Sequence, residues 1–161
     1  MATRVGAVLP RGARRFYVAV AVILAAIVFA GFARTFYLNA YFAKRDLSAL
    51  RILHGTVFSL WLVLLIAQTS LVAAKRTDLH RRLGVLGAIL AGLMIVVGMA
   101  MALNAARYGF QTPGLPPPLV FLAVPFFDIV VFSILVAAAL YYRQKPDVHK
   151  RLMVLTTISE A

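Results

Sequence analysis

Two histidines occupy the same place in two copies of one short motif. The segment from Arg76 to Leu83 aligns with the segment from Lys145 to Leu152 at an offset of 69 residues, and the Asp, His, Arg and Leu positions are identical. Each copy separates two apolar runs, so His80 and His149 should lie at a similar depth in a membrane. Histidine is a common metal ligand. The pair could therefore serve as the two axial ligands of a haem b.

The same repeat also fits a turn that begins a helix. Asp78 and Asp147 would then be N-cap residues, accepting hydrogen bonds from free amides and favoured by the helix dipole. The surrounding Lys and Arg residues would lie among lipid phosphates. Such a position, in the outermost turn and among cations, is a poor one for burying a porphyrin. A helix start without any cofactor is thus the simpler expectation, and the haem site is the alternative.

A third histidine belongs to a stripe on the second apolar run. The stripe recurs at spacings of four, three, four, three and four, which places its members on one helix face. The simpler interpretation is the packed side of the helix. The alternative is a pocket for a quinone, a pigment or a haem, because an aromatic wall with a few polar groups suits a flat apolar ligand. The stripe consists of His54, Phe58, Trp61, Leu65, Gln68 and Val72.

One acidic residue, Asp128, lies inside an apolar run. A buried carboxylate in a membrane is costly and is usually paired. Asp128 is ~21 Å from the inner boundary of its helix, and Arg34 is ~27 Å along its own helix, at 1.5 Å per residue. A long arginine side chain can span the difference. We expect a buried Arg34–Asp128 pair or a protonated Asp128, with a proton relay between Asp128 and His54 as the alternative.

The composition of the chain is that of a membrane protein. Of its 161 residues, 63% are hydrophobic and 14% are charged, against about 45–50% and about 25% in soluble domains. Four apolar runs are long enough to cross a hydrocarbon core of ~30 Å. The sequence predicts one all-α domain over residues 1–161, a four-helix transmembrane bundle. Its spans are residues 16–37, 52–74, 83–103 and 119–142.

The third span carries small residues four apart, which allow helices to approach closely. Gly84, Ala88 and Gly92 form this stripe, and we expect the helix to lie at the centre of the bundle or against a partner protein. Cysteine is absent, and the sequence contains no metal-binding cluster, nucleophile elbow or phosphate loop. An enzymatic role is therefore the less favoured one.

The basic residues predict the orientation. The N-terminal segment, the loop 75–82 and the segment 143–151 hold twelve Lys and Arg, whereas the loops 34–51 and 105–118 hold five. Cytoplasmic loops carry the excess of positive charge, so both termini should be cytoplasmic, in a bacterial inner membrane. Because the cations cluster at the ends of apolar runs, the net charge of +12 indicates contact with the lipid bilayer, with no nucleic acid as partner.

Several segments resemble a family of uncharacterised bacterial multipass membrane proteins. The segments that carry this resemblance are T-F-Y-L from Thr35, L-H-G-x-x-F-x-x-W from Leu53, Q-T-x-L-V-A from Gln68, D-L-H-R-R-L-G from Asp78 and H-K-R-L-M from His149. Members of that family are longer and supply no activity. The eleven residues from Arg151 begin like a fifth helix but reach only ~16 Å. We expect them to lie in the membrane interface or to begin a helix that a longer protein would complete.

The sequence thus favours a non-catalytic membrane protein, an accessory or assembly subunit of a larger membrane complex with other membrane subunits as partners. A b-type haem or quinone-binding electron-transfer protein, using His80 with His149 or using His54, is the alternative.

Overall fold

The computed structural model describes residues 11–44, 46–109 and 116–160, and within these ranges all regular structure is helical. The elements follow in the order α1 (Arg11–Phe32), the π-helix η1 (Ala33–Tyr37), α2 (Asn39–Phe42), α3 (Ala49–Ala73), α4 (Thr77–Tyr108), α5 (Pro118–Phe121), α6 (Ala123–Tyr141), the 3-10 helix η2 (Tyr142–Gln144) and α7 (Pro146–Ile158).

Four stretches of this chain are long and apolar enough to cross a membrane. They are Arg15–Tyr37, Ala49–Ala73, Thr77–Tyr108 and Pro118–Gln144. The all-α, four-span prediction is therefore confirmed, with α3 and α4 starting three and six residues earlier than expected. The 32 residues of α4 extend ~48 Å at 1.5 Å per residue, so this helix continues past the hydrocarbon core.

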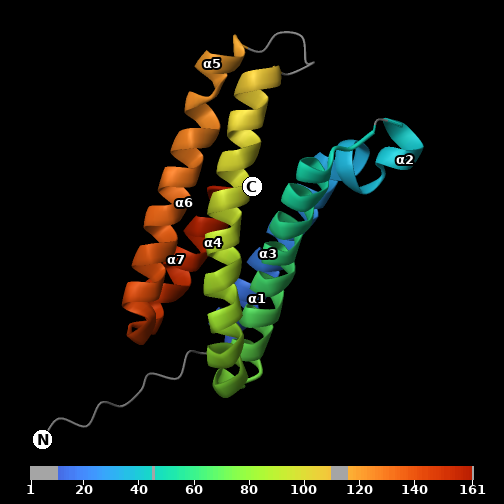
Figure 1. Cartoon of the computed structure of the whole chain (residues 1–161). Helices are drawn as coiled ribbons and strands as arrows, with labels where there is room; N and C mark the ends of the chain where they lie inside the picture. Colours follow the sequence, from blue (N-terminus) through green and yellow to red (C-terminus); the bar gives the residue numbers. More distant parts are fainter. Residues whose placement is uncertain (1–10, 45, 110–115, 161) are drawn as a thin grey trace, which may run out of the picture.

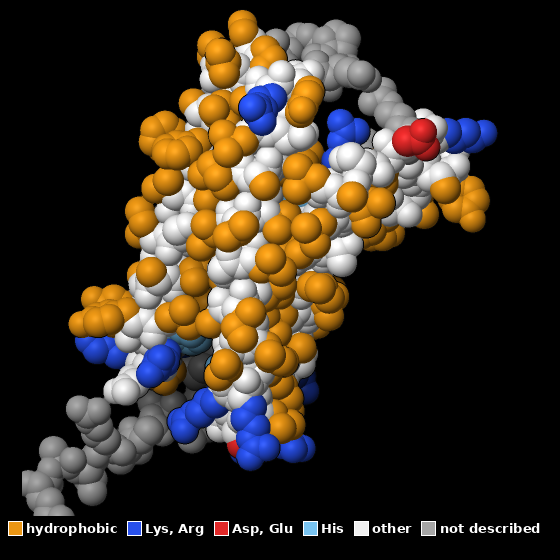
Figure 2. Space-filling model, in the orientation of Figure 1, with side chains coloured by type: hydrophobic (Ala, Val, Ile, Leu, Met, Phe, Trp, Pro, Cys, Tyr) orange, Lys and Arg blue, Asp and Glu red, His pale blue; other side chains and the backbone are white. Residues whose placement is uncertain are grey.

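The helices pack in a row with α4 in the interior. α3 packs against both α1 and α4, α4 against α6, and α6 against α7. Figure 1 shows the two turns α3–α4 and α6–α7 at one end, together with the start of α1, and α2 and α5 at the other. We call the first the basic end, because most described Lys and Arg side chains gather there (Figure 2). The opposite end holds the remaining four, Arg34, Lys44, Arg51 and Arg107.

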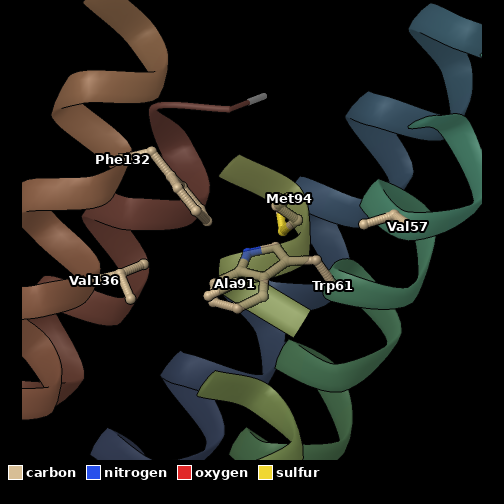
Figure 3. Packing of buried hydrophobic residues seen from close by; sticks show 6 residues of the cluster. All are labelled: Val57, Trp61, Ala91, Met94, Phe132 and Val136. Carbon is tan, nitrogen blue, oxygen red and sulfur yellow. The ribbon is translucent and has the colours of Figure 1, made fainter. Parts of the chain in front are cut away.

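A cluster of apolar side chains joins the three central spans. Trp61 reaches from α3 toward Phe132 of α6, and their ring centroids are 5.6 Å apart (Figure 3). The cluster consists of Val57, Trp61, Ala91, Met94, Phe132 and Val136. Trp61 and Leu65, two of the six residues of the α3 stripe, are buried, so the middle of the stripe belongs to the packed side of the helix.

Small residues bring α4 close to both neighbours, as expected for a central helix. A β-carbon on Gly87 would lie 3.1 Å from Leu64 of α3, and one on Gly98 would lie 3.4 Å from Ile129 of α6. Gly92, by contrast, faces outward, with open space where a β-carbon would lie. The face of α4 that packs against α3 and α6 therefore carries Gly87 and Gly98. The predicted small-residue stripe faces outward at Gly92.

Of the two arrangements expected for the segment from Arg151, the interfacial one is not what the structure has: α7 packs along α6, and its end is buried in the bundle. Thr156 and Thr157 are 0% and 1% exposed. Trp61 Nε1 donates a hydrogen bond of 3.1 Å to Thr157 Oγ1, and Thr157 Oγ1 donates to the main-chain oxygen of Met153. Thr156 Oγ1 donates to the main-chain oxygen of Leu152. Because both hydroxyls are satisfied, the two threonines can be buried among apolar neighbours.

The expected N-caps are also corrected. Asp78 and Asp147 are the second residues of α4 and α7, and the N-cap positions belong to Arg76 and Lys145, neither of which makes a side-chain cap. Pro146 takes the first helical position, which suits its fixed φ angle. Both acids nevertheless lie in the first turn, where the helix dipole favours negative charge.

Candidate ligand site at the basic end

The two motif copies bring their histidines together. His80 is the fourth residue of α4, His149 is the fourth residue of α7, and both helices start at the basic end. Their ring centroids are 6.2 Å apart, with the ring planes at 78°. The expectation of equal depth is thus realised as direct proximity, although the residues are 69 positions apart in the sequence.

The ring of His149 is fixed by the neighbouring helix. Its Nδ1 lies 2.8 Å from the main-chain oxygen of Ala139 in α6. A carbonyl oxygen only accepts, so Nδ1 is the protonated nitrogen. In the neutral ring Nε2 is then the acceptor, available to a metal or a proton. Metal-binding histidines are commonly oriented by such a bond to a carbonyl.

His80 is held in a related way by α3. The main chain of Gln68 lies beside its ring, and its Nδ1 is buried without a hydrogen-bond partner. Each imidazole therefore lies against the main chain of an adjacent helix, and His80 has a ring nitrogen left for a further contact.

Gln68 brings a second unsatisfied atom to the same place. Its side-chain nitrogen would lie 3.8 Å from a β-carbon on Gly84, one turn after His80. Its Oε1 is buried without a partner, which costs about 1–3 kcal/mol. A buried amide oxygen and a buried imidazole nitrogen, both unsatisfied, mark a place where a ligand or a water molecule would be stabilised.

Each of the two histidines is followed in the sequence by a cation, Arg81 after His80 and Lys150 after His149. The Lys150 ammonium lies 5.5 Å from the centre of the Tyr17 ring, which brings α1 to the site. Lys150 also pairs with Asp147, and this hydrogen bond and charge lower the pKa of the exposed Asp147 carboxyl. A ligand with carboxylate or phosphate groups would meet complementary charge here.

His54 lies at the opposite end and takes no part in this site. Its ring stacks on Phe58 of the same helix, with centroids 4.2 Å apart, and its Nδ1 is buried without a partner. Close by, Gly55 is packed against the ring of Phe36, which would be 2.3 Å from a β-carbon at that position. The three histidines thus divide into a pair at the basic end and one at the other end.

The predicted pairing of buried Arg34 with Asp128 is wrong. Both side chains are exposed on the surface of the chain, and the Arg34 guanidinium lies 5.3 Å from the centre of the Phe42 ring. α1 packs against α3, whereas α6 packs against α4 and α7, so their helices are kept apart. The alternative, a relay between Asp128 and His54, gains no support, because the Asp128 side chain is exposed on α6 and the His54 ring lies against Phe58 of α3.

Asp128 instead has an acidic neighbour that sequence reasoning missed. Glu160 lies close enough for the two carboxylates to repel each other, and its Oε1 is buried without a partner. Glu160 is the only glutamate in the chain, and an acid at the end of an apolar segment was a usable signal. No family of known proteins, no curated protein and no solved structure matches this chain.

Proposed function

We propose that this chain is a membrane haem protein in which His80 and His149 would hold the iron of one haem b. The observation that carries this proposal is the spacing of their rings. The centroids are 6.2 Å apart, His80 Nδ1 is buried without a hydrogen-bond partner, and the bond from His149 Nδ1 to Ala139 leaves the Nε2 of that ring as an acceptor. Two imidazoles with nitrogens to spare in one place are a set of residues that could hold a metal.

The ligand set also favours haem. A haem brings its own macrocycle nitrogens, so it would need only one or two ligands from the protein. Held by His80 and His149, it would supply electron transfer. Arg81 and Lys150 would pair with the haem propionates, because charge-assisted hydrogen bonds to carboxylates are strong. In the sequence analysis these cations counted against a porphyrin; in this proposal they would bind its propionates.

An absorption spectrum tests this function. The protein, expressed with added haem and purified in mild detergent, should give the sharp reduced bands of a six-coordinate haem after dithionite. His80→Ala and His149→Ala should each lose these bands, and His54→Ala, the matched control, should keep them. A colourless wild type, or bands that survive both substitutions, would rule out this haem site.

A second proposal, compatible with the first, is that the chain is an accessory or assembly subunit of a larger membrane complex. Asp128 favours it: the residue is ten positions from Pro118 and sixteen from Gln144 within one span, and its side chain is exposed. Charged residues in membrane spans rarely face lipid. A partner protein on this face of α6 would shield the carboxylate.

Size in gentle detergent tests the subunit proposal. We expect an assembly well above the 17.6 kDa of the chain. Gly92→Leu, on the outward face of α4, and Asp128→Asn should release the chain while its four spans still insert. A monodisperse monomer, indifferent to both substitutions, would contradict the proposal.

We also propose the orientation that the charge distribution favours, with the basic end in the bacterial cytoplasm. Reporter fusions after Thr77 or Asp147 should read as cytoplasmic, and those after Gly109 as periplasmic. The opposite pattern would reverse the orientation.

A further inference from the structure

An apolar groove of about 640 Å³ opens between α1 and α3 at the basic end. Its α1 side runs from Arg15 to Ile23, and its other side is formed at the end of α3 by Ser70, Ala73 and the C-cap residue Ala74. The small side chains Ala19, Ala73 and Ala74 leave the space between the helices. Eight residue steps along α1 correspond to ~12 Å, a length that suits part of an acyl chain.

Charge is confined to the membrane-surface end of this groove. Arg15 is the one charged residue in its lining, and the exposed Lys75 and Arg76 follow Ala74 directly in the sequence. Toward the middle of the membrane the α1 wall consists of Val18, Val22 and Ile23. A ligand for this groove therefore has an apolar tail and an anionic head at the level of the lipid phosphates.

We propose that the groove is a binding site for an anionic phospholipid, with one acyl chain between α1 and α3 and the phosphate at Arg15. Basic residues at membrane ends attract anionic lipid headgroups, and the apolar walls distinguish a seated chain from a lipid held only at the surface. The site is separate from the histidine pair, so the proposal is independent of haem binding.

Lipid retention by the purified protein tests it. The protein is stripped of lipid in detergent, offered phosphatidylglycerol or phosphatidylcholine with identical acyl chains, and examined by native mass spectrometry. We expect phosphatidylglycerol to be retained several-fold more. Arg15→Gln should remove this preference, and Ala19→Phe, which fills the groove, should reduce retention of both lipids by a similar factor.

Two matched controls make the result specific. Arg143→Gln removes a cation at the other turn of the basic end, and Ala26→Phe places the same ring on an exposed part of α1 outside the groove. Both should retain lipid as the wild type does. The fluorescence of the only tryptophan, Trp61, reports whether each variant is folded. Equal retention of the two lipids by the wild type, equal loss in the controls, or a quinone in the extract that phosphatidylglycerol cannot displace would overturn the proposal.

Discussion

Both ends of the bundle carry a histidine whose Nδ1 is buried without a partner, yet their surroundings differ. At the basic end His80 meets His149, and residues from α1, α3, α4, α6 and α7 lie within one cluster. At the opposite end His54 stacks on Phe58 of its own helix. The hydrogen bond between Tyr37 and Ser59, 2.8 Å long, joins only η1 and α3 there. A histidine with an unpartnered nitrogen is a better candidate for a ligand site where several helices converge on it, as at His80. It is a poorer candidate where its neighbour is one aromatic ring of its own helix, as at His54.

The largest expected effect is on thermal stability: haem should stabilise the folded protein through the basic end and not through the opposite end. A ligand at 1,000 times its dissociation constant stabilises the folded state by about 4 kcal/mol. Haem loading should therefore raise the thermal midpoint of the wild type and of His54→Ala, but not that of His149→Ala. The measurement is thermal unfolding in detergent with and without haem. An equal rise in all three proteins would show that haem binds elsewhere.

Removing the bond that holds α7 against α3 should lower the affinity for haem at the basic end. Thr157→Val removes the acceptor of the Trp61 indole N–H, and a buried donor without a partner costs about 1–3 kcal/mol. Tryptophan fluorescence should change, and haem affinity should fall because α7 carries His149. Thr69→Val is the matched control, since that hydroxyl bonds only to carbonyls of its own helix. Identical behaviour of the two variants would contradict a docking role for the Trp61–Thr157 bond.

Crowding the opposite end should leave the basic end intact. A β-carbon on Gly55 would lie 2.3 Å from the Phe36 ring, and overpacking costs about 1–2 kcal/mol where a ring can move aside. Gly55→Ala should lower the unfolding midpoint without altering the reduced haem spectrum. Gly31→Ala, with nothing within 4 Å of the new atom, is the control. A changed spectrum in Gly55→Ala would mean that the two ends are coupled.

The smallest expected effect concerns pH at the basic end. Lys150 lowers the pKa of folded Asp147, so the ionised carboxylate stabilises the folded state above the ordinary aspartate pKa of about 4. That stabilisation is lost as the pH falls through the folded pKa. Unfolding midpoints of wild type and Asp147→Asn should differ slightly at neutral pH and converge in acid. Lys150→Gln should give the same profile; a difference that persists in acid would exclude this ion pair as its cause.

The sequence by itself determined the four spans, because runs of apolar residues about 20 long have no stable place outside a bilayer. It also determined the common depth of His80 and His149, since both occupy the same position after the same kind of turn. The packed face of α3 followed from helical periodicity, with Trp61 and Leu65 buried as that face predicts.

Tertiary structure decided which polar groups meet. Depth along a helix is a one-dimensional quantity, so it could align Arg34 with Asp128 but could not show that α1 and α6 pack against different neighbours. The insertion of α7 depends on Trp61 and Ala139, partners contributed by α3 and α6, and no local pattern in residues 146–158 encodes them. The proximity of the two histidines likewise exists because α7 returns along α6, which only the packing of the whole chain determines.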